Sequence, residues 1–372
     1  MKRIGFLYSK IYDIENLRLA HKNASKGKGW YKEVQEINKD PDKYLKQIQQ
    51  MLINKTFKTS PYQMFEKKDG EKIRKIYKLP YFPDRIVQWA IMQVIEPYLV
   101  KNFTTDTYSA ISKRGIHAAL GRIKNDMYFD TEGCEYCLKF DIRHYYQCIN
   151  HRILKKKFRR LFKDQDLLEL LDEVIDSIVT SEDTDLAIIW AGFEDIDTET
   201  GIPIGNYLSQ FCGNFYLSSF DHFVKEVLKV THYYRYMDDI VIFAETKEQL
   251  RKIYVKIKAY LLENLKLYIK PNWQIFPTYK RGVDFVGYRL FKGFMLLRRT
   301  TCKHMKEKLL KIRKKCSKGN MVNYSEYCSI NSYIGWTKHC DSFRLENKYI
   351  RVLSPHAEKY YNTVIKKGVK AA

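Results

Sequence analysis

The spacing of apolar side chains predicts helices at both ends of the chain. Within residues 1–60, apolar positions recur at the period of an amphipathic helix, as at Leu45 and Ile48. The run Lys-Gly-Lys-Gly at 26–29 interrupts this pattern and is typical of a flexible basic loop. Beyond residue 300 the pattern is again helical and strongly cationic. We therefore expect a basic helical extension at the start and a helical domain at the end.

Between these ends, short β-rich runs alternate with helices. Two such runs within 64–80 flank a Lys-Asp-Gly turn and predict a hairpin. Pro83 and Asp84 open an apolar helix that is expected to end near Pro97. The acidic stretch 181–200 has no clear period and predicts a loop between lobes. Further strands are expected at 137–142, 232–243 and 283–297.

The balance of charge suggests what the chain binds. Its 372 residues include 66 Lys and Arg against 43 Asp and Glu, a formal net charge of +23. Such an excess concentrates polyanions near the protein and favours contacts with phosphate backbones. A+T-rich codon usage would also enrich Lys, Asn, Ile and Tyr, but Glu does not rise with Lys. Nucleic-acid binding is therefore the better interpretation.

Two further features bear on the compartment. No apolar run approaches the roughly 18–20 residues that span a bilayer, and the first residues lack the apolar core of a signal peptide. Cys134 and Cys137 form a lone C-x2-C without a second pair at zinc-site spacing, so we interpret the eight cysteines as reduced thiols. We expect a cytoplasmic protein with no membrane partner.

Two separate segments place aspartate at the end of an apolar strand. In 138–146 a strand presents Asp141 at its end and then turns into a helix. In 231–243 two aromatic and β-branched runs flank Met-Asp-Asp, the pattern of a hairpin with Asp238 and Asp239 at its tip. Adjacent side chains of a regular strand point to opposite faces, so two neighbouring acids aim at one site only near a turn.

These three carboxylates predict a metal site. Carboxylates within apolar strands repel one another and are costly to bury without a cation. Mg²⁺, with Mn²⁺ as the alternative ion, takes hard oxygen ligands and bridges substrate phosphates. We expect Asp141 and Asp238 to bridge two ions, with Asp239 and the backbone carbonyl of Ile142 as further ligands. Each acid alone is better explained by a solvated turn; their combination favours catalysis.

A third segment, 201–210, joins a loop to a long helix that runs past Phe220. Gly205 allows the backbone to approach a base pair closely, while Ser209 and Gln210 place polar groups early on the helix. A lone Gly-x-x-x-Ser has little specificity, because such junctions are common.

Taken in order, these segments resemble the motifs of reverse transcriptases. The strand that bears Asp141, the junction at 204–210 and Tyr-Met-Asp-Asp at 236–239 follow one another as in that family. The resemblance runs from about residue 60 to residue 340. Three further segments are similar to the family's fingers, primer grip and thumb, namely 74–88, 285–288 and 333–336.

The resemblance implies an α+β, right-hand polymerase fold with fingers, a palm built on an antiparallel sheet and a helical thumb. It also implies RNA-directed DNA polymerase activity with a template RNA, a primer and dNTPs as partners. The expected boundaries are a basic helical N-terminal extension at 1–60, fingers at 61–133 and 155–200, palm at 134–154 and 201–292, and a helical thumb with the C-terminal tail at 293–372.

Several side chains are implied to bind the incoming nucleotide. Tyr146 stands five residues after Asp141, where the family's ring blocks a ribose 2′-hydroxyl; packing beneath the palm is the alternative. Lys270 is a candidate for protonating the pyrophosphate. The alternative is that it is an exposed lysine at the end of a strand. The candidates to clamp the triphosphate are Arg74, Lys75 and Lys78.

Other positions are expected to contact the template or primer. Arg85 either contacts the template or caps its own helix. The cationic run between residues 303 and 315 lies near aromatic residues, which favours a thumb that grips the template–primer minor groove over a solvated helix face. The remaining candidates are Tyr236, Met237, Gly287, Tyr288 and Trp336.

The junction also indicates a subtype. Most families have Gln before the Gly and Pro after the Ser, whereas here Ile204 precedes Gly205 and Gln210 follows Ser209. This form resembles the reverse transcriptases of diversity-generating retroelements, which copy a template-repeat RNA with errors at adenines before the cDNA replaces a variable repeat. Near a templating base, Ile204 lacks the hydrogen bond of a Gln, which loosens base selection. The resemblance further implies a small, basic, helical accessory protein.

Three alternatives stay open. One is another prokaryotic reverse transcriptase, of the retron, antiphage-defence or group II intron kind. The intron kind is disfavoured because only about 80 residues follow Tyr288. The second is an RNA-dependent RNA polymerase, which Tyr146 disfavours. The third is a non-catalytic RNA-binding protein, which the three acids disfavour.

Overall fold

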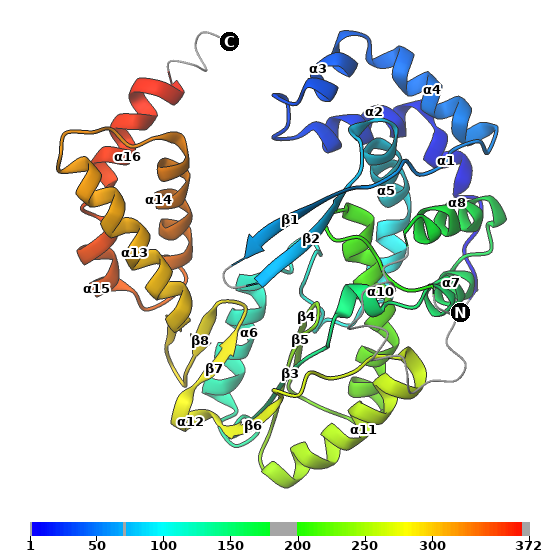
Figure 1. The fold of residues 1–372 in the computed structure, drawn as a ribbon. Coiled ribbons are helices and arrows are strands. Elements are labelled where there is room, and N and C mark those ends of the chain that lie inside the picture. The colour runs from blue at the N-terminus through cyan, green and yellow to red at the C-terminus, as the bar shows by residue number, and fades with distance from the viewer. Residues whose placement is uncertain (1, 70–71, 179–198, 367–372) are drawn as a thin grey trace. The chain divides into compact units, whose positions relative to one another are not determined.

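The computed structural model describes residues 2–69, 72–178 and 199–366, which form two compact units (Figure 1). The first unit comprises Met1–Ser112, Phe140–Ile240 and Lys252–Trp273, and the second comprises Lys113–Lys139, Val241–Arg251 and Gln274–Ala372. This division follows compactness, so the boundaries of extension, fingers, palm and thumb stay a prediction.

The N-terminal extension is helical, as expected. Its helices are α1 (Tyr8–Tyr12), α2 (Ile14–Ser25), α3 (Lys32–Lys39) and α4 (Pro41–Ile53). Asp13 caps α2 by accepting hydrogen bonds from the amides of Glu15 and Asn16, and Asp40 caps α4 by accepting one from Lys43. Such caps contribute about 1 kcal/mol each. Short polar side chains therefore set where these helices begin.

The predicted end of the apolar helix near Pro97 is wrong. Helix α5 (Ile86–Lys101) runs through Pro97 for another turn. An interior proline costs about 3 kcal/mol. Ile95 and Leu99, on either side of it, are completely buried, and burying such side chains contributes about 1.5–3 kcal/mol each. Burial of the two neighbours therefore offsets the lost backbone hydrogen bond.

The first unit contains several further helices. They are the short η1 (Tyr81–Arg85), η2 (Tyr145–Cys148) and η3 (Phe223–Val227), and the longer α7 (His151–Leu161), α8 (Gln165–Asp176) and α10 (Tyr207–His222). Helix α10 follows the junction at 201–206 and extends past Phe220, as the sequence predicted. Helix α11 (Lys247–Leu265) begins in the second unit and ends in the first.

A four-stranded sheet carries the predicted acidic strands. Its order is β4-β5-β3-β6, from β3 (Tyr136–Asp141), β4 (Tyr233–Tyr236), β5 (Asp239–Ala244) and β6 (Gln274–Pro277). Strands β4 and β5 are joined by a tight turn, which confirms the predicted hairpin. Strand β6 pairs antiparallel with β3 and was not predicted, because four residues are too few to show a period.

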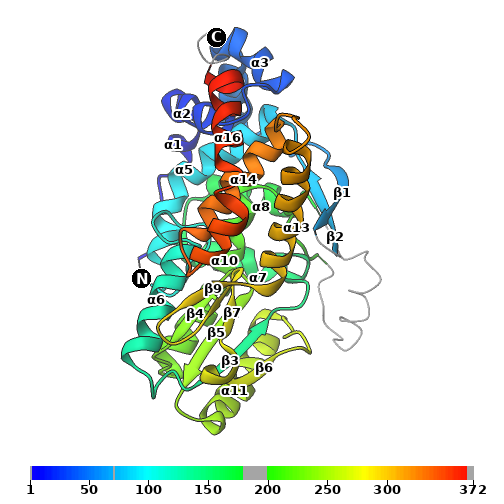
Figure 2. The same cartoon turned by 90° about the vertical axis from the view of Figure 1, so that its left-hand side faces the viewer.

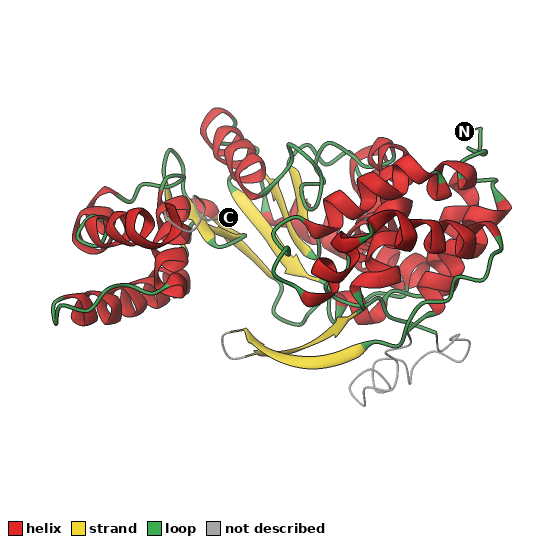
Figure 3. Ribbon diagram, turned by 90° about the horizontal axis from the view of Figure 1, so that it is seen from above, coloured by secondary structure: helices red, strands yellow, loops and turns green. Residues whose placement is uncertain are grey.

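A separate two-stranded sheet confirms the hairpin expected within 64–80. It consists of β1 (Gln63–Asp69) and β2 (Lys72–Lys78), paired antiparallel with Gln63 opposite Lys78. Figure 3 shows it as a long pair of arrows. Residues 70–71 of the turn lie outside the described part of the chain, as does nearly all of the acidic stretch predicted to be a loop at 181–200.

The second unit contains a three-stranded sheet with helices before it and a helical region after it. The long helix before the sheet is α6 (Ile116–Phe129), and the sheet has the order β7 (Val283–Phe285), β8 (Tyr288–Leu290) and β9 (Met295–Leu297). In the helical region, α14 packs against α13 and α16 (Figure 2). The remaining elements are α12 (Thr278–Arg281), α13 (Arg299–Cys316), α14 (Tyr324–Thr337), α15 (Phe343–Leu345), η4 (Glu346–Ile350), α16 (Ser354–Tyr360) and η5 (Tyr361–Ile365). Among the described helices, none is long and apolar enough to cross a membrane.

A completely buried ion pair lies in the core of the first unit. The Arg235 guanidinium of β4 donates two hydrogen bonds to the Asp221 carboxylate of α10, at 2.7 and 2.6 Å. Asp221 also accepts hydrogen bonds from Tyr233, at 2.5 Å, and Thr107, at 3.0 Å. Burial by itself lowers the pKa of Arg235, but Asp221 raises it above the usual value. The pair is therefore charged and well satisfied.

Breaking the pair of Asp221 and Arg235 should lower the stability of the protein. Asp221→Asn leaves the Arg235 charge buried without a counter-charge, so the free energy of unfolding should fall by about 3–5 kcal/mol. The control is Glu248→Gln, which breaks the exposed pair with Arg251 and should cost less than about 1 kcal/mol. Denaturant unfolding compares the two variants; equal stabilities would contradict the role assigned to the buried pair.

Candidate active site

The three predicted acids occupy strand ends on neighbouring strands. Asp141 is the last residue of β3, Asp238 lies in the turn between β4 and β5, and Asp239 is the first residue of β5. The amide of Ile142 donates to the carbonyl of Asp238 at 3.3 Å, which ties the end of β3 to the turn. The fold thus brings together residues that are almost one hundred positions apart.

The carboxylates of Asp141 and Asp238 converge on one cation. The Lys270 ammonium lies 3.5 Å from Asp141 Oδ2 and 4.0 Å from Asp238 Oδ2. The Lys270 amide also donates to the carbonyl of Asp141 at 2.9 Å, which fixes the lysine beside the acid. The side chains of Asp141 and Asp238 are 30% and 36% exposed, so solutes reach them. Two acids that share one ammonium are suited to share a divalent ion.

The backbone of the turn that bears Asp238 is strained, and neighbouring side chains hold it in this conformation. Met237 has a φ of 55°, in the left-handed region that side chains other than glycine rarely adopt. Its carbonyl accepts a hydrogen bond from the buried Arg235 guanidinium at 3.2 Å. Its sulfur accepts one from the Tyr146 hydroxyl at 3.5 Å. Two hydrogen bonds to Met237, one to its carbonyl and one to its sulfur, therefore hold the turn that bears Asp238.

Tyr146 lies beside the acids, as its predicted role requires. It belongs to η2, and its ring is largely buried next to the ring of Tyr145. Burial raises the pKa of the Tyr146 hydroxyl, and the nearby Asp238 carboxylate raises it further. The hydroxyl therefore stays neutral and acts as a hydrogen-bond donor. Tyr236, also a predicted contact, is the last residue of β4 and is half-buried.

A cavity of about 170 Å³ brings several other candidates together. Lys78, Arg85 and Gly205 all line it. Gly205 has a φ of 119°, which favours glycine, and a Cβ there would lie 3.7 Å from Ile76 on β2. The junction therefore packs closely against the β1–β2 hairpin. The lining residues that the sequence did not single out are Tyr31, Phe65, Ile76, Tyr77, Leu79, Gln88 and Asn206.

Positive charge gathers around this cavity. The Lys78 ammonium lies 5.8 Å from the centre of the Tyr31 ring, a cation–π contact. Burial lowers the pKa of Lys28, and the neighbouring Arg85 lowers it further. Lys28 comes from the basic loop at 26–29, so the N-terminal extension adds cationic groups to this face. Such a face is suited to phosphate.

The other junction and hairpin candidates are less closely gathered. Ile204 is half-buried in the turn that contains Gly205, Ser209 is buried within α10, and Gln210 is exposed. Lys75 is exposed on β2. The side chain of Arg74 lies outside the described residues. The roles of all five stay predictions.

The candidates near the C-terminus form a cluster within the second unit. Tyr288 stacks on Trp336 with ring centres 5.3 Å apart and donates a hydrogen bond to the Trp336 carbonyl at 2.9 Å. Gly287 has a φ of 90°, and a Cβ there would lie 2.5 Å from the Trp336 ring. Three residues that the sequence assigned separately to primer grip and thumb are therefore in direct contact.

The sequence pattern did not identify the buried residues that hold the turn bearing Asp238. Arg235 lies between two tyrosines on β4, and Asp221 lies within the apolar helix α10. A signal was present, because charged residues on apolar elements are almost never buried unless they are paired. Nothing in the spacing identified which two charges pair.

Comparison with known proteins gives one family match. The model of the family "Reverse transcriptase (RNA-dependent DNA polymerase)" matches residues 65–290. YkfC of Escherichia coli (strain K12) is 25% identical over 259 residues, 60% of this chain and 65% of that protein. The group II intron-encoded protein LtrA of Lactococcus lactis subsp. cremoris is 24% identical over 185 residues, 49% of this chain and 28% of that protein. The chain therefore spans just under two thirds of the first relative and far less of the second.

A solved structure of telomerase from Candida albicans, in complex with a TWJ fragment of telomeric RNA, is also similar. Its TM-score is 0.49 at 12% identity, over 70% of this chain and 52% of that chain.

The packing of Trp336 against Gly287 should make a side chain at position 287 destabilising. Gly287→Ala and Gly293→Ala both place a side chain at positive φ, which costs about 1–2 kcal/mol. A Cβ at Gly293 meets nothing within 4 Å, whereas one at Gly287 meets Trp336. Gly287→Ala should therefore lose about 1–3 kcal/mol more in denaturant unfolding, because the ring must move. Equal losses in the two variants would show that Trp336 does not pack there.

Proposed function

The chain belongs to the reverse transcriptase family, because the family match covers more than half of its length, and we propose that it copies an RNA template into DNA. It adds deoxynucleotides to the 3′ end of a primer. The expected α+β, right-hand polymerase fold is confirmed by this match and by the mixture of helices and antiparallel strands.

One observation carries the proposal: the Asp141 and Asp238 carboxylates lie within 4.0 Å of the same ammonium. Lys270 supplies positive charge beside both anions, and a divalent cation would stabilise them further. Their donor atoms are hard oxygens, which suit Mg²⁺, or Mn²⁺ in its place. Asp239 and the carbonyl of Ile142 lie beside them and are further candidate ligands. The residues present thus fit a site for two divalent ions.

Each residue then has a chemical task. Asp141 and Asp238 would hold the ions, with Asp239 as an accessory ligand. Divalent ions bound there would supply activation of the primer 3′-hydroxyl and stabilisation of the leaving pyrophosphate. Lys270, which lies beside both acids, would donate a proton to the pyrophosphate.

Substrate selection is assigned to the surrounding side chains. The Tyr146 ring, held by its hydrogen bond to Met237, excludes a ribose 2′-hydroxyl and so favours dNTPs over rNTPs. Lys78 and Arg85, which line one cavity with Gly205, bind phosphates of the nucleotide or template. Lys75 and Arg74 on the same hairpin are further candidates for the triphosphate. Tyr288 and Trp336 are proposed contacts of the primer.

Removing one acid should abolish synthesis. Asp238→Asn should lower the rate of Mg²⁺-dependent primer extension on RNA by roughly 10³-fold, because each bound ion contributes several kcal/mol to the transition state. The matched control is Glu245→Gln, which changes an exposed acid shortly after β5 and should retain the rate. Primer extension with radiolabelled dNTP measures both. Undiminished synthesis by Asp238→Asn would refute the assignment.

We further propose that the chain serves a diversity-generating retroelement. The support is the junction, where Ile204 stands in place of Gln and Gln210 follows Ser209. Ile204 shares a tight turn with Gly205, which lines the cavity beside β2. An apolar side chain there gives no hydrogen bond that would reject a mispaired nucleotide. A small, basic, helical accessory protein belongs to the same proposal.

Restoring the polar group tests the subtype. Ile204→Gln should lower misincorporation opposite template adenine by about 10-fold or more, since one hydrogen bond is worth about 0.5–1.5 kcal/mol and a buried unpaired group costs more. Sequencing of cDNA made by the purified enzyme gives the error rate at each template base. An unchanged rate at adenine, with errors at other bases also unchanged, would contradict the role of Ile204.

A further inference from the structure

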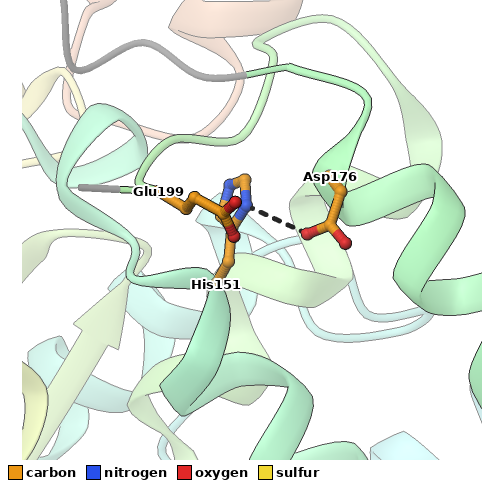
Figure 4. Close-up of side chains that lie close together, drawn as sticks. All are labelled: His151, Asp176 and Glu199. Carbon is orange, nitrogen blue, oxygen red and sulfur yellow. Dashed lines mark ion pairs between the residues drawn. The ribbon is translucent and has the colours of Figure 1, made fainter. Parts of the chain in front are cut away.

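Three side chains outside the proposed polymerase site converge in the first unit. His151 begins α7, Asp176 ends α8, and Glu199 lies just before the junction. Figure 4 shows the three side chains close together, with a dashed line for the ion pair of His151 and Asp176. One ligand atom from each residue lies within 4.8 Å of the other two. The His151 amide also donates to the Glu199 carbonyl at 3.1 Å, so the backbone holds the group together.

The hydrogen bonding of His151 leaves one ring nitrogen available. Nε2 lies 2.7 Å from the carbonyl oxygen of Gly201. A carbonyl only accepts, so Nε2 carries the proton and a neutral ring has its lone pair on Nδ1. Within the described residues Nδ1 has no hydrogen-bond partner, although His151 is completely buried. The Asp176 carboxylate lies 3.3 Å from Nδ1 without accepting a hydrogen bond from it, so a cation beside this carboxylate could also bind Nδ1.

The geometry fits a small tetrahedral ion. Zinc binds His nitrogen and carboxylate oxygen at about 2.0–2.2 Å, so two of its ligands lie roughly 3.3–3.5 Å apart. The 3.3 Å between His151 Nδ1 and Asp176 Oδ1 agrees with this. Glu199 is exposed, and because its ligand atom lies within 4.8 Å of the other two, a movement of at most about 1.5 Å would bring its carboxylate to the same distance. A histidine that binds zinc also commonly donates its other N–H to a carbonyl, as His151 does to Gly201.

We propose that His151, Asp176 and Glu199 bind a zinc ion, with water as the fourth ligand. The nitrogen ligand separates this site from the all-oxygen site at Asp141 and Asp238, because Mg²⁺ prefers oxygen. The Lys155 ammonium forms an ion pair with the same Asp176 Oδ1, so it would move aside when zinc binds and serve as the outer partner of that ligand.

The site has a structural consequence. The ion would join α7, α8 and the segment that enters the junction. Gly201, which accepts the hydrogen bond from His151, is only three residues from Ile204. Zinc binding would therefore fix the start of the turn that contains Ile204 and Gly205.

The test measures zinc directly and needs no polymerase reaction, so it can fail independently of the proposed function. The full chain with Asp141→Asn and Asp238→Asn is stripped with a chelator, dialysed against Zn²⁺ and analysed for bound metal. It should bind one equivalent. Zinc at about 100 times its dissociation constant should raise the melting temperature by roughly 3–5 °C.

Three additional substitutions in that background decide the outcome. His151→Gln should weaken zinc binding by at least about 10-fold, and so should Glu199→Gln, which changes an exposed side chain and keeps the test valid if His151→Gln does not fold. Asp172→Asn, on α8 but paired with Arg159, should bind zinc normally. Failure of the parent to bind zinc, or equal binding by Glu199→Gln and Asp172→Asn, would overturn the proposal; the contact of His151 with Asp176 would then be explained by a protonated imidazole.

Discussion

The buried pair of Arg235 and Asp221 is the interaction on which the proposed polymerase site depends. Its charges are satisfied from three elements, because Thr107, α10 and β4 all contribute hydrogen bonds. The same guanidinium reaches past the pair to the carbonyl of Met237, within the turn that presents Asp238. A buried pair gives little net stability compared with apolar packing, but its directional bonds fix the turn in one conformation.

Helix α10 links the two halves of the proposed chemistry. Its start follows Gly205, which packs against the hairpin and lines the cationic cavity. Further along, Asn214 accepts a hydrogen bond from Arg235 at 3.1 Å, and Asp221 completes the pair. One rigid helix therefore sets both the junction and the acidic turn. The proposed zinc ion would add a third constraint at the chain segment that enters this helix.

The sequence predicted strands and turns that have a local pattern of residues. It did not predict features that depend on contacts between distant parts of the chain. The strand ending at Asp141 and the hairpin at Asp238 were predicted correctly, because alternation and turn residues are local signals. The end of the helix at Pro97 was wrong, since burial of Ile95 and Leu99 is a tertiary effect. The cluster of His151, Asp176 and Glu199 was not foreseen either, because its members are more than twenty residues apart in sequence and only the fold brings them together. Lys78, Arg85 and Gly205 line one cavity, although the sequence assigned them three separate roles, and those roles stay predictions.

The central claim is that Asp141 and Asp238 share divalent ions. Its most direct test is a crystal structure of the chain with Mn²⁺, primer–template and a nonhydrolysable dNTP, in which anomalous scattering locates the metal. Manganese should be bonded to carboxylate oxygens of both Asp141 and Asp238. Manganese bound to neither acid, or carboxylates that have moved apart in that complex, would contradict it.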